Sequence, residues 1–431
     1  MRLAHGIGTR SDLPVPTSLA AVAAAAALLI SFAVLALLWR RPRETRQGRP
    51  LPAVVAALLD AEPVRVGLRL ATLLIAVLVC VAGLVGPVDP SVNVAPWALY
   101  VTFWVGLVPA SLVFGPVWRV LNPLRLPQLW VARLLRLDPD SGALPLPAAV
   151  GYWPAAVSLF GYAWLELVFP DRAEPAEVAT FLLVYGGVHL SAGIVFGRRW
   201  FARCDGFEVY SALLGAMAPL ARRADGRLVL RNPLDGLASV PLGPGLSATV
   251  VTLIGSTAYD GLSRTQWWNA TVPPGPVPAT VGLVGSVLLI GVVFLLGTWT
   301  VASTRAEGNA GVVAFASTLA PIAAGYAIAH YFSLLIFDGQ QTVILVSDPL
   351  GTGADLIGTT DRAIDYAVIS TTGIALVQLG AIVVGHLLAA VSAHDQAYRL
   401  FGPRTALRTQ YPMLAAMVLL TMAAVGLVFA A

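Results

Sequence analysis

The sequence predicts an all-α integral membrane protein, a polytopic bundle of about ten transmembrane helices with the N-terminus and the C-terminus both outside. Hydrophobic residues make up 57% of the 431 residues and charged residues only 12%, whereas soluble domains have about half and about a quarter. Several apolar runs reach the roughly 20 residues that a helix needs to cross a bilayer. The basic residues, all of them arginine, gather beside these runs, as is typical of loops that stay cytoplasmic.

The chain divides into a short extracytoplasmic tail at 1–16 and a single transmembrane bundle at 17–431, with a cytoplasmic or interfacial connection at 200–245. No polar stretch is long enough to build a separate soluble domain. Cys80 and Cys204 have neither the number nor the spacing of a disulfide framework or a zinc site. The pI near 9.3 comes from arginines that flank spans, so orientation in the membrane explains it and no nucleic-acid partner is expected.

The positions of the arginines predict how the spans of the first half of the chain are oriented in the membrane. The first apolar run, 17–39, is followed by five arginines within 40–49, which places the N-terminus outside. A mildly apolar stretch at 50–62 is expected to form an interfacial helix, and an amphipathic stretch at 207–220 is expected to lie in the interface as well. The next four spans are expected at 67–86, 96–114, 148–169 and 178–197.

The second half begins with the weakest span, 246–259, which is short for a straight crossing. Without this crossing, the aspartate-rich loop at 338–365 would be cytoplasmic and the arginines at 399–408 would be external, against the usual charge distribution. The remaining spans are expected at 278–301, 311–337, 367–391 and 411–430. In this topology only five of the 27 arginines are external, namely Arg2, Arg10, Arg172, Arg264 and Arg362.

The best pointer to a site is His330, which lies within an apolar span, with Tyr326 one helical turn before it on the same face. Ionisable side chains at membrane depth are costly, rarely face lipid and mark binding sites or proton relays. Five further titratable groups are expected to converge with His330 on a site that opens to the outside: Glu166, Asp260 and Asp338 near the outer ends of spans, His5 on the external tail, and His189, which lies deeper.

Two chemistries fit such a site. Histidine and carboxylate ligands from separate helices can hold Zn²⁺ or Cu and activate water, and the same groups can instead relay protons in a transporter. No HExxH, GxSxG or P-loop motif in the sequence selects one of them. A lone histidine in a membrane helix is also a common interhelical hydrogen-bond donor, so a purely structural interpretation stays open. In the metal interpretation the ligands are His330, His5, Glu166 and His189, and the base is Asp338 or Asp260.

Five short stretches, spread over most of the chain, carry a family resemblance: 4–8 (Ala-His-Gly-Ile-Gly), 10–14 (Arg-Ser-Asp-Leu-Pro), 114–123 (Phe-Gly-Pro-Val-Trp-Arg-Val-Leu-Asn-Pro), 330–333 (His-Tyr-Phe-Ser) and 392–395 (Ser-Ala-His-Asp). In these stretches the chain resembles a group of actinobacterial multi-pass membrane proteins commonly labelled fenitrothion hydrolase. The resemblance implies hydrolysis of organophosphorus triesters. It also implies a signal peptide before the Ala-His-Gly run, so that cleavage after Ala4 would make His5 an amino-terminal chelate for Cu or another metal.

These observations predict a membrane-embedded, metal-assisted hydrolase of organophosphorus esters in the plasma membrane, with the lipid bilayer and a small-molecule substrate as its partners. One alternative is a transporter or permease component that moves an ion, metal or small solute. Another is a non-catalytic membrane partner in an envelope complex. The hydrolase requires bound metal and a loss of turnover in His330→Ala, the transporter requires a second, inward-facing polar cluster around His386, and the partner requires an exposed helix face of small residues.

Overall fold

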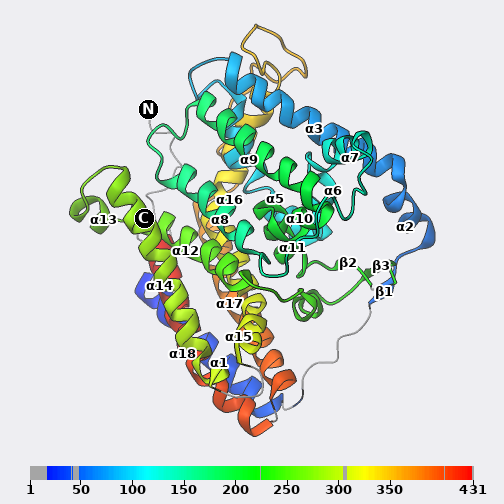
Figure 1. Cartoon of the computed structure of the whole chain (residues 1–431). Coiled ribbons are helices and arrows are strands. Elements are labelled where there is room, and N and C mark those ends of the chain that lie inside the picture. Colours follow the sequence, from blue (N-terminus) through cyan, green and yellow to red (C-terminus); the bar gives the residue numbers. More distant parts are fainter. Residues whose placement is uncertain are drawn as a thin grey trace.

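The computed structural model describes residues 17–39, 41, 48–223, 225–303, 308–401 and 403–429, and nearly all of its elements are helices (Figure 1). Eight helical segments are long and apolar enough to cross a membrane, which makes the chain a multi-pass membrane protein. These segments are α1 (Thr17–Leu38), α3 (Glu62–Val85), the series α4 (Val94–Pro96), η1 (Trp97–Phe103) and α5 (Leu107–Phe114), α9 (Pro175–Phe196), α14 (Pro276–Ala302), the series α15 (Gly308–Ala316), η3 (Ser317–Leu319) and α16 (Ala320–Leu345), α17 (Thr371–Leu400) and α18 (Pro403–Phe429).

The two other stretches that we expected to span form shorter or more polar helices. The stretch expected at 148–169 gives α8 (Trp153–Leu167), which has 15 residues and Pro154 in its first turn. The stretch expected at 246–259 gives α12 (Leu246–Arg264), whose 19 residues run past the expected end. Neither helix is among the eight candidate spans, so the number of ten crossings and the outside position of both termini stay predictions.

Helix α12 lies in the interior, against α8, α14 and α16. Twelve of its 19 residues are buried. At Gly255 a β-carbon would lie 2.6 Å from the Cα of Val287 on α14, so only glycine allows the two helices to approach this closely. Several of its hydroxyl side chains donate to carbonyl oxygens of their own helix, as where Thr257 donates to the carbonyl of Leu253 at 2.8 Å. The end of this helix therefore carries Asp260 into the interior of the bundle.

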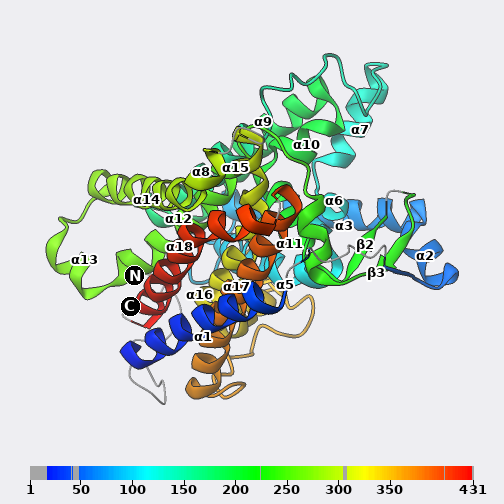
Figure 2. The same cartoon turned by 90° about the horizontal axis from the view of Figure 1, so that it is seen from below.

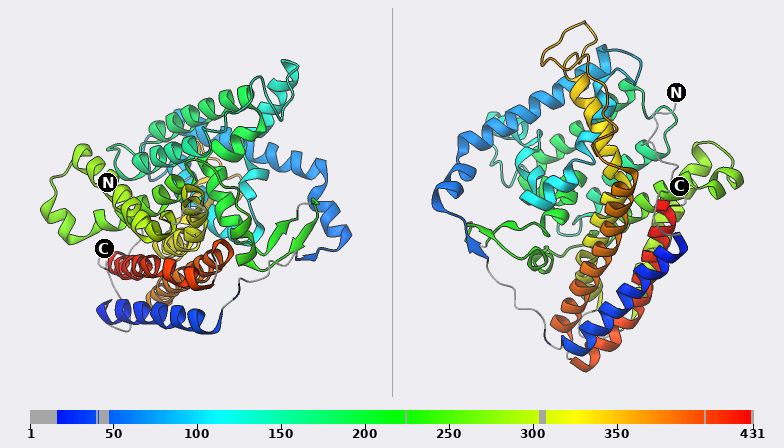
Figure 3. Two further views of the ribbon diagram at one scale, coloured as in Figure 1. Left: turned by 60° about the horizontal axis from the view of Figure 1, so that its bottom comes forward. Right: turned by 180° about the vertical axis from the view of Figure 1, so that it is seen from behind.

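Helices α16 and α17 also pack closely, through two glycines. A β-carbon at Gly325 would lie 2.4 Å from the carbonyl oxygen of Ala381, and one at Gly385 would lie 2.6 Å from that of Pro321. Small residues commonly bring membrane helices together in this way, because van der Waals contact replaces the hydrophobic effect. Beside this pair, α1 and α18 run along one another (Figure 3).

A small antiparallel sheet, which the sequence did not predict, joins the N-terminal helices to the long connection. Its strands are β1 (Arg49–Pro50), β2 (Leu220–Arg222) and β3 (Leu228–Leu230), in the order β1-β3-β2. Figure 2 places this sheet and α2 at one end of the molecule and α13 at the other. The remaining elements are α2 (Ala53–Asp60), α6 (Val117–Leu121), α7 (Arg125–Leu134), α10 (Arg198–Cys204), α11 (Gly206–Gly215), η2 (Pro233–Ser239) and α13 (Gln266–Thr271).

Two of these helices correspond to stretches that we expected in the interface. Helix α2 buries none of its residues, and Val54 is 81% exposed, as an interfacial helix requires. Helix α11 differs from the expectation, because nine of its ten residues are buried and it packs against α5, α6, α8 and α10. Glu208, the one charged residue of the stretch 207–220, is paired inside the protein with Arg125.

Candidate functional site

The side chains of His330 and Asp260 meet between α16 and α12. Nε2 of His330 lies 2.7 Å from Oδ2 of Asp260, and the two side chains are only 5% and 3% exposed. The hydroxyl of Tyr331 donates to the same oxygen at 3.0 Å. Arg264 donates to the other oxygen, Oδ1, from Nη2 at 2.6 Å and from Nε at 3.0 Å. Asp260 is therefore the centre of a buried polar cluster drawn from two helices.

Local geometry accounts for this cluster. Arg264 follows Asp260 by four residues, which places both side chains on one face of α12. Next to Asp260, Gly261 leaves space for a tyrosine, since a β-carbon there would lie 2.7 Å from the hydroxyl oxygen of Tyr326. The Tyr326 ring stacks on the His330 ring, with centroids 5.9 Å apart and an angle of 19° between the planes. The imidazole is thus held by a carboxylate on one edge and an aromatic face on one side.

Glu166 lies near this cluster, at the end of α8. Its side chain is 3% exposed, and it interacts electrostatically with Asp260 and Arg264. Its Oε1 atom has no hydrogen-bond partner among the described residues. A buried carboxylate oxygen in this state requires a proton, a water molecule or a ligand to satisfy it. Of the six residues that the sequence singled out, the structure thus brings His330, Asp260 and Glu166 into one region.

The other three residues have different positions. His189 accepts a hydrogen bond at Nδ1 from Nε1 of Trp200 at 3.0 Å and contacts the Tyr185 ring, so its contacts are with α9 and α10. Asp338 is 8% exposed and follows His330 on α16 by eight residues, a rise of about 12 Å along the axis. His5 lies outside the described residues. His189 therefore does not contact the region that contains His330. Asp338 lies on the same helix as His330 but is displaced along its axis.

The described residues do not offer a ready metal site. Among them, no group of three or more histidine, cysteine, aspartate or glutamate side chains could hold a metal ion. Arg264 also places a positive charge directly on the carboxylate of Asp260, where it opposes binding of a cation. The expectation of Zn²⁺ or Cu therefore stays a prediction that needs ligands from elsewhere in the chain.

The cluster can instead accept a proton. In the tautomer whose hydrogen is on Nε2, His330 donates to Oδ2 of Asp260. Nδ1 of His330 has no hydrogen bond to a described residue. In a neutral imidazole this second nitrogen carries the lone pair. A carboxylate that orients an imidazole whose other nitrogen is free is the arrangement of a general base.

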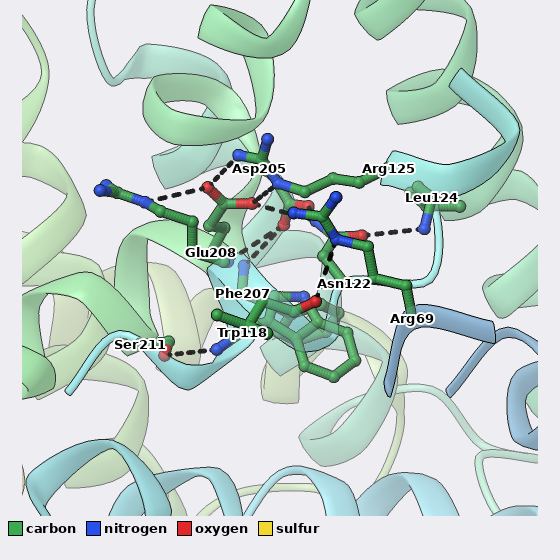
Figure 4. Close-up of polar contacts among 11 residues, drawn as sticks. Arg69, Trp118, Asn122, Leu124, Arg125, Asp205, Phe207, Glu208 and Ser211 are labelled. Carbon is green, nitrogen blue, oxygen red and sulfur yellow. Dashed lines mark hydrogen bonds and ion pairs between the residues drawn. The ribbon is translucent and has the colours of Figure 1, made fainter. Parts of the chain in front are cut away.

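A second buried polar cluster, which the sequence analysis missed, surrounds Glu208 on α11 (Figure 4). Arg125 of α7 donates to both carboxylate oxygens of Glu208, with Nε at 3.0 Å from Oε2. Asn122 donates to Asp205 at 2.8 Å and to Glu208 at 3.2 Å. Asp205 in turn caps α11 by accepting from the backbone nitrogens of Phe207 and Glu208.

Two sequence signals could have located this second cluster. Asp205 and Glu208 have the three-residue spacing of a helix capping box, and Asn122 belongs to one of the stretches that carry the family resemblance. Burial raises the pKa of Asp205 to about 6, and repulsion from Glu208 adds to the effect. The pairing of Arg125 with Glu208 joins residues 83 positions apart, and no spacing rule predicts it.

No protein-family model, no curated protein and no solved structure matches the chain. The resemblance to the proteins labelled fenitrothion hydrolase therefore stays a prediction. Any functional assignment has to be argued from the residues themselves.

Proposed function

We propose that the chain is a membrane-embedded hydrolase of organophosphorus esters in which His330, oriented by Asp260, is the general base. The observation that supports this most is the 2.7 Å contact between Nε2 of His330 and Oδ2 of Asp260, together with an Nδ1 atom that has no hydrogen bond to any described residue. The site opens to the outside in the proposed topology, in which α8 and α12 complete ten crossings of the plasma membrane and both termini are external.

The proposed reaction needs only groups of this cluster and water. Nδ1 of His330 takes a proton from water while the water oxygen bonds to phosphorus, and Asp260 stabilises the imidazolium that forms. Arg264, whose side chain is 30% exposed, stabilises the negative charge that develops on the phosphoryl oxygen. The bond from phosphorus to the leaving alkoxide or phenolate then breaks, and the proton passes from Nδ1 to the leaving oxygen.

A divalent metal is not required by these steps, and the described residues do not fit one. The sequence-based proposal of Zn²⁺ or Cu would depend on His5 joining His330 and Glu166. Metal analysis of the detergent-purified protein tests it, with His330→Ala as the comparison. Stoichiometric metal that is lost with His330 supports the metal-assisted version, whereas metal-free protein with full turnover removes it.

Proton-coupled transport is a second candidate, because a further buried histidine lies on the neighbouring helix. His386 of α17 is 1% exposed, its Nδ1 lies 2.8 Å from the carbonyl oxygen of Ile382, and its Nε2 has no partner among the described residues. It sits beside Gly385, where α16 and α17 approach each other. A proton relay would use two such groups at different depths.

One experiment distinguishes the candidates. The wild type, His330→Ala and His386→Ala are purified and assayed for release of nitrophenolate from diethyl 4-nitrophenyl phosphate, and for proton uptake in proteoliposomes. The hydrolase predicts turnover that falls at least about 100-fold in His330→Ala and persists in His386→Ala. Folded wild-type protein without turnover, but with proton uptake that both variants abolish, contradicts the hydrolase and supports the transporter.

A further inference from the structure

The protein also has a large cavity that is separate from the Asp260 cluster and lined by different residues. Its volume is about 1050 Å³, and it is bounded by α3, by α5 to α7, by α10 and α11, and by the small sheet. None of the residues of the Asp260 cluster lines it. Nine arginines line it, and Glu62 is the single acidic residue among its described lining residues. Such an excess of one charge sign needs a counter-charge.

Ion pairs with nearby carboxylates compensate only part of this charge. Asp60 pairs with Arg65 and Arg222, and Glu208 pairs with Arg125. Asp140 pairs with Arg198 at the surface. In contrast, Arg119 is 53% exposed and reaches Glu208 only at 3.7 Å. For Arg69, Arg133 and Arg203, the structure gives no ion pair with a described carboxylate.

Arg69 shows the repulsion most directly. Its Nε donates to the carbonyl oxygen of Val120 at 3.2 Å, and Figure 4 shows its side chain beside that of Arg125. It interacts electrostatically with three other arginines, Arg65, Arg125 and Arg198, and with one carboxylate, Glu208. Several positive charges in a partly buried space repel one another strongly, because the local dielectric constant is low. An anion in the cavity would remove this repulsion.

Most of the remaining lining is apolar, and part of it belongs to candidate membrane spans. Val66 and Leu68 belong to α3 and are 37% and 43% exposed, and Phe114, at the end of α5, is 64% exposed. All three are in candidate membrane spans. The cavity thus combines a cationic wall with an apolar side that belongs to helices in the bilayer.

We propose that this cavity binds an amphiphile with a phosphate headgroup, such as an anionic phospholipid. The guanidinium groups of Arg69, Arg119 and Arg133 contact the phosphate oxygens, for which the planar fork of arginine is well suited. The acyl chains lie along Val66, Leu68 and Phe114 and pass into the bilayer. The same charge distribution makes this the cytoplasmic side of the protein, where basic pockets between membrane helices bind acidic lipids.

The test uses full-length protein in dodecyl maltoside. The midpoint of thermal unfolding is measured while dioleoyl-phosphatidylglycerol, dioleoyl-phosphatidylcholine or inorganic phosphate is added. A ligand that binds only the folded state raises the midpoint as its concentration rises. Phosphatidylglycerol is expected to raise it by several degrees, with little effect of phosphatidylcholine at the same concentration. In Arg119→Gln the concentration needed is expected to rise about tenfold, the loss of one charge-assisted contact.

The matched control is Arg227→Gln, since Arg227 is an exposed arginine between β2 and β3 that does not line the cavity. It should respond to phosphatidylglycerol as the wild type does. If Arg119→Gln does not fold, Arg133→Gln, at another exposed lining position, takes its place. Equal responses to both lipids, or equal responses of the cavity variant and the control, overturn the proposal. If inorganic phosphate alone raises the unfolding midpoint as much as phosphatidylglycerol does, the proposal of an amphiphile is overturned and the cavity is a site for a small anion.

Discussion

Nε2 of His330 and Oδ2 of Asp260 lie 2.7 Å apart, although the residues are 70 positions apart and belong to different helices. Arg264 on the other carboxylate oxygen and Tyr331 on the same one complete the arrangement. Arg264 and Tyr331 fix the carboxylate of Asp260, and this carboxylate in turn orients the imidazole of His330. The consequences for stability and for turnover can be measured separately.

Asp260→Asn removes the charge that Arg264 and His330 share. We expect the free energy of unfolding to fall by about 2 kcal/mol, less than the loss for a fully buried pair, because Arg264 is 30% exposed and water can solvate it. Thermal unfolding in detergent measures the effect. Asp361→Asn, an exposed position in the loop after α16, is the control and should leave the midpoint unchanged. Equal midpoints for the two variants would show that the pair does not hold the helices.

Gly261→Ala tests the space beside Asp260. The new methyl group would lie 2.7 Å from the Tyr326 hydroxyl and 3.1 Å from Cβ of Leu427, so Tyr326 has to move off His330. Overpacking of this kind costs about 1–3 kcal/mol. Gly285→Ala is the matched control, since Gly285 lies inside α14 with nothing within 4 Å of its added β-carbon. That change should be neutral or stabilising by about 0.5–1 kcal/mol, and a stable Gly261→Ala would contradict the packing.

The Asp205 carboxyl predicts a pH dependence of stability. Its folded pKa of about 6 lies above the unfolded value near 3.9, so the folded state binds the proton more tightly. The contribution of the Asp205 carboxyl to the free energy of unfolding is present below about pH 4 and is lost as the pH rises to about 6. The change is about 3 kcal/mol. The free energy of unfolding of the wild type, relative to that of Asp205→Asn, should therefore fall as the pH rises over this range. Asparagine keeps the helix cap, so the comparison isolates the charge.

Asp60→Asn is the control with the opposite sign. The hydrogen bond from Arg222 lowers the pKa of Asp60, so its contribution is present above about pH 4 and is lost as the pH falls. Wild type should therefore gain stability over Asp60→Asn as the pH rises from 3 to 5. Parallel stability curves for wild type and Asp205→Asn between pH 4 and 7 would contradict the burial of this carboxyl.

Composition and the lengths of the apolar runs predicted a helical, multi-pass fold. Apolar runs of membrane length gave helices close to their expected bounds, as α1 and α9 illustrate. Helix α12 runs five residues past its expected end at 259, and Asp260 and Arg264 pair with each other in this added turn. The sheet was not predicted, because strands of two or three residues carry no periodic pattern.

Depth in the membrane predicted part of the candidate site. It led to the expectation that His330, Asp260 and Glu166 converge, and the structure places them in one region. Depth carries no information on which neighbour a helix faces, so His189 was added to the site although it bonds to Trp200. For the same reason the pairing of Glu208 with Arg125 was missed, since only the folded chain brings these residues together.

The most direct test of the central claim is a double-mutant cycle in turnover of diethyl 4-nitrophenyl phosphate, with wild type, His330→Gln, Asp260→Asn and the double variant. If Asp260 acts through His330, each single change lowers turnover by at least about 100-fold. The turnover of the double variant is then no lower than that of the less active single variant. Losses that multiply in the double variant, or a single variant with wild-type turnover, would contradict the claim.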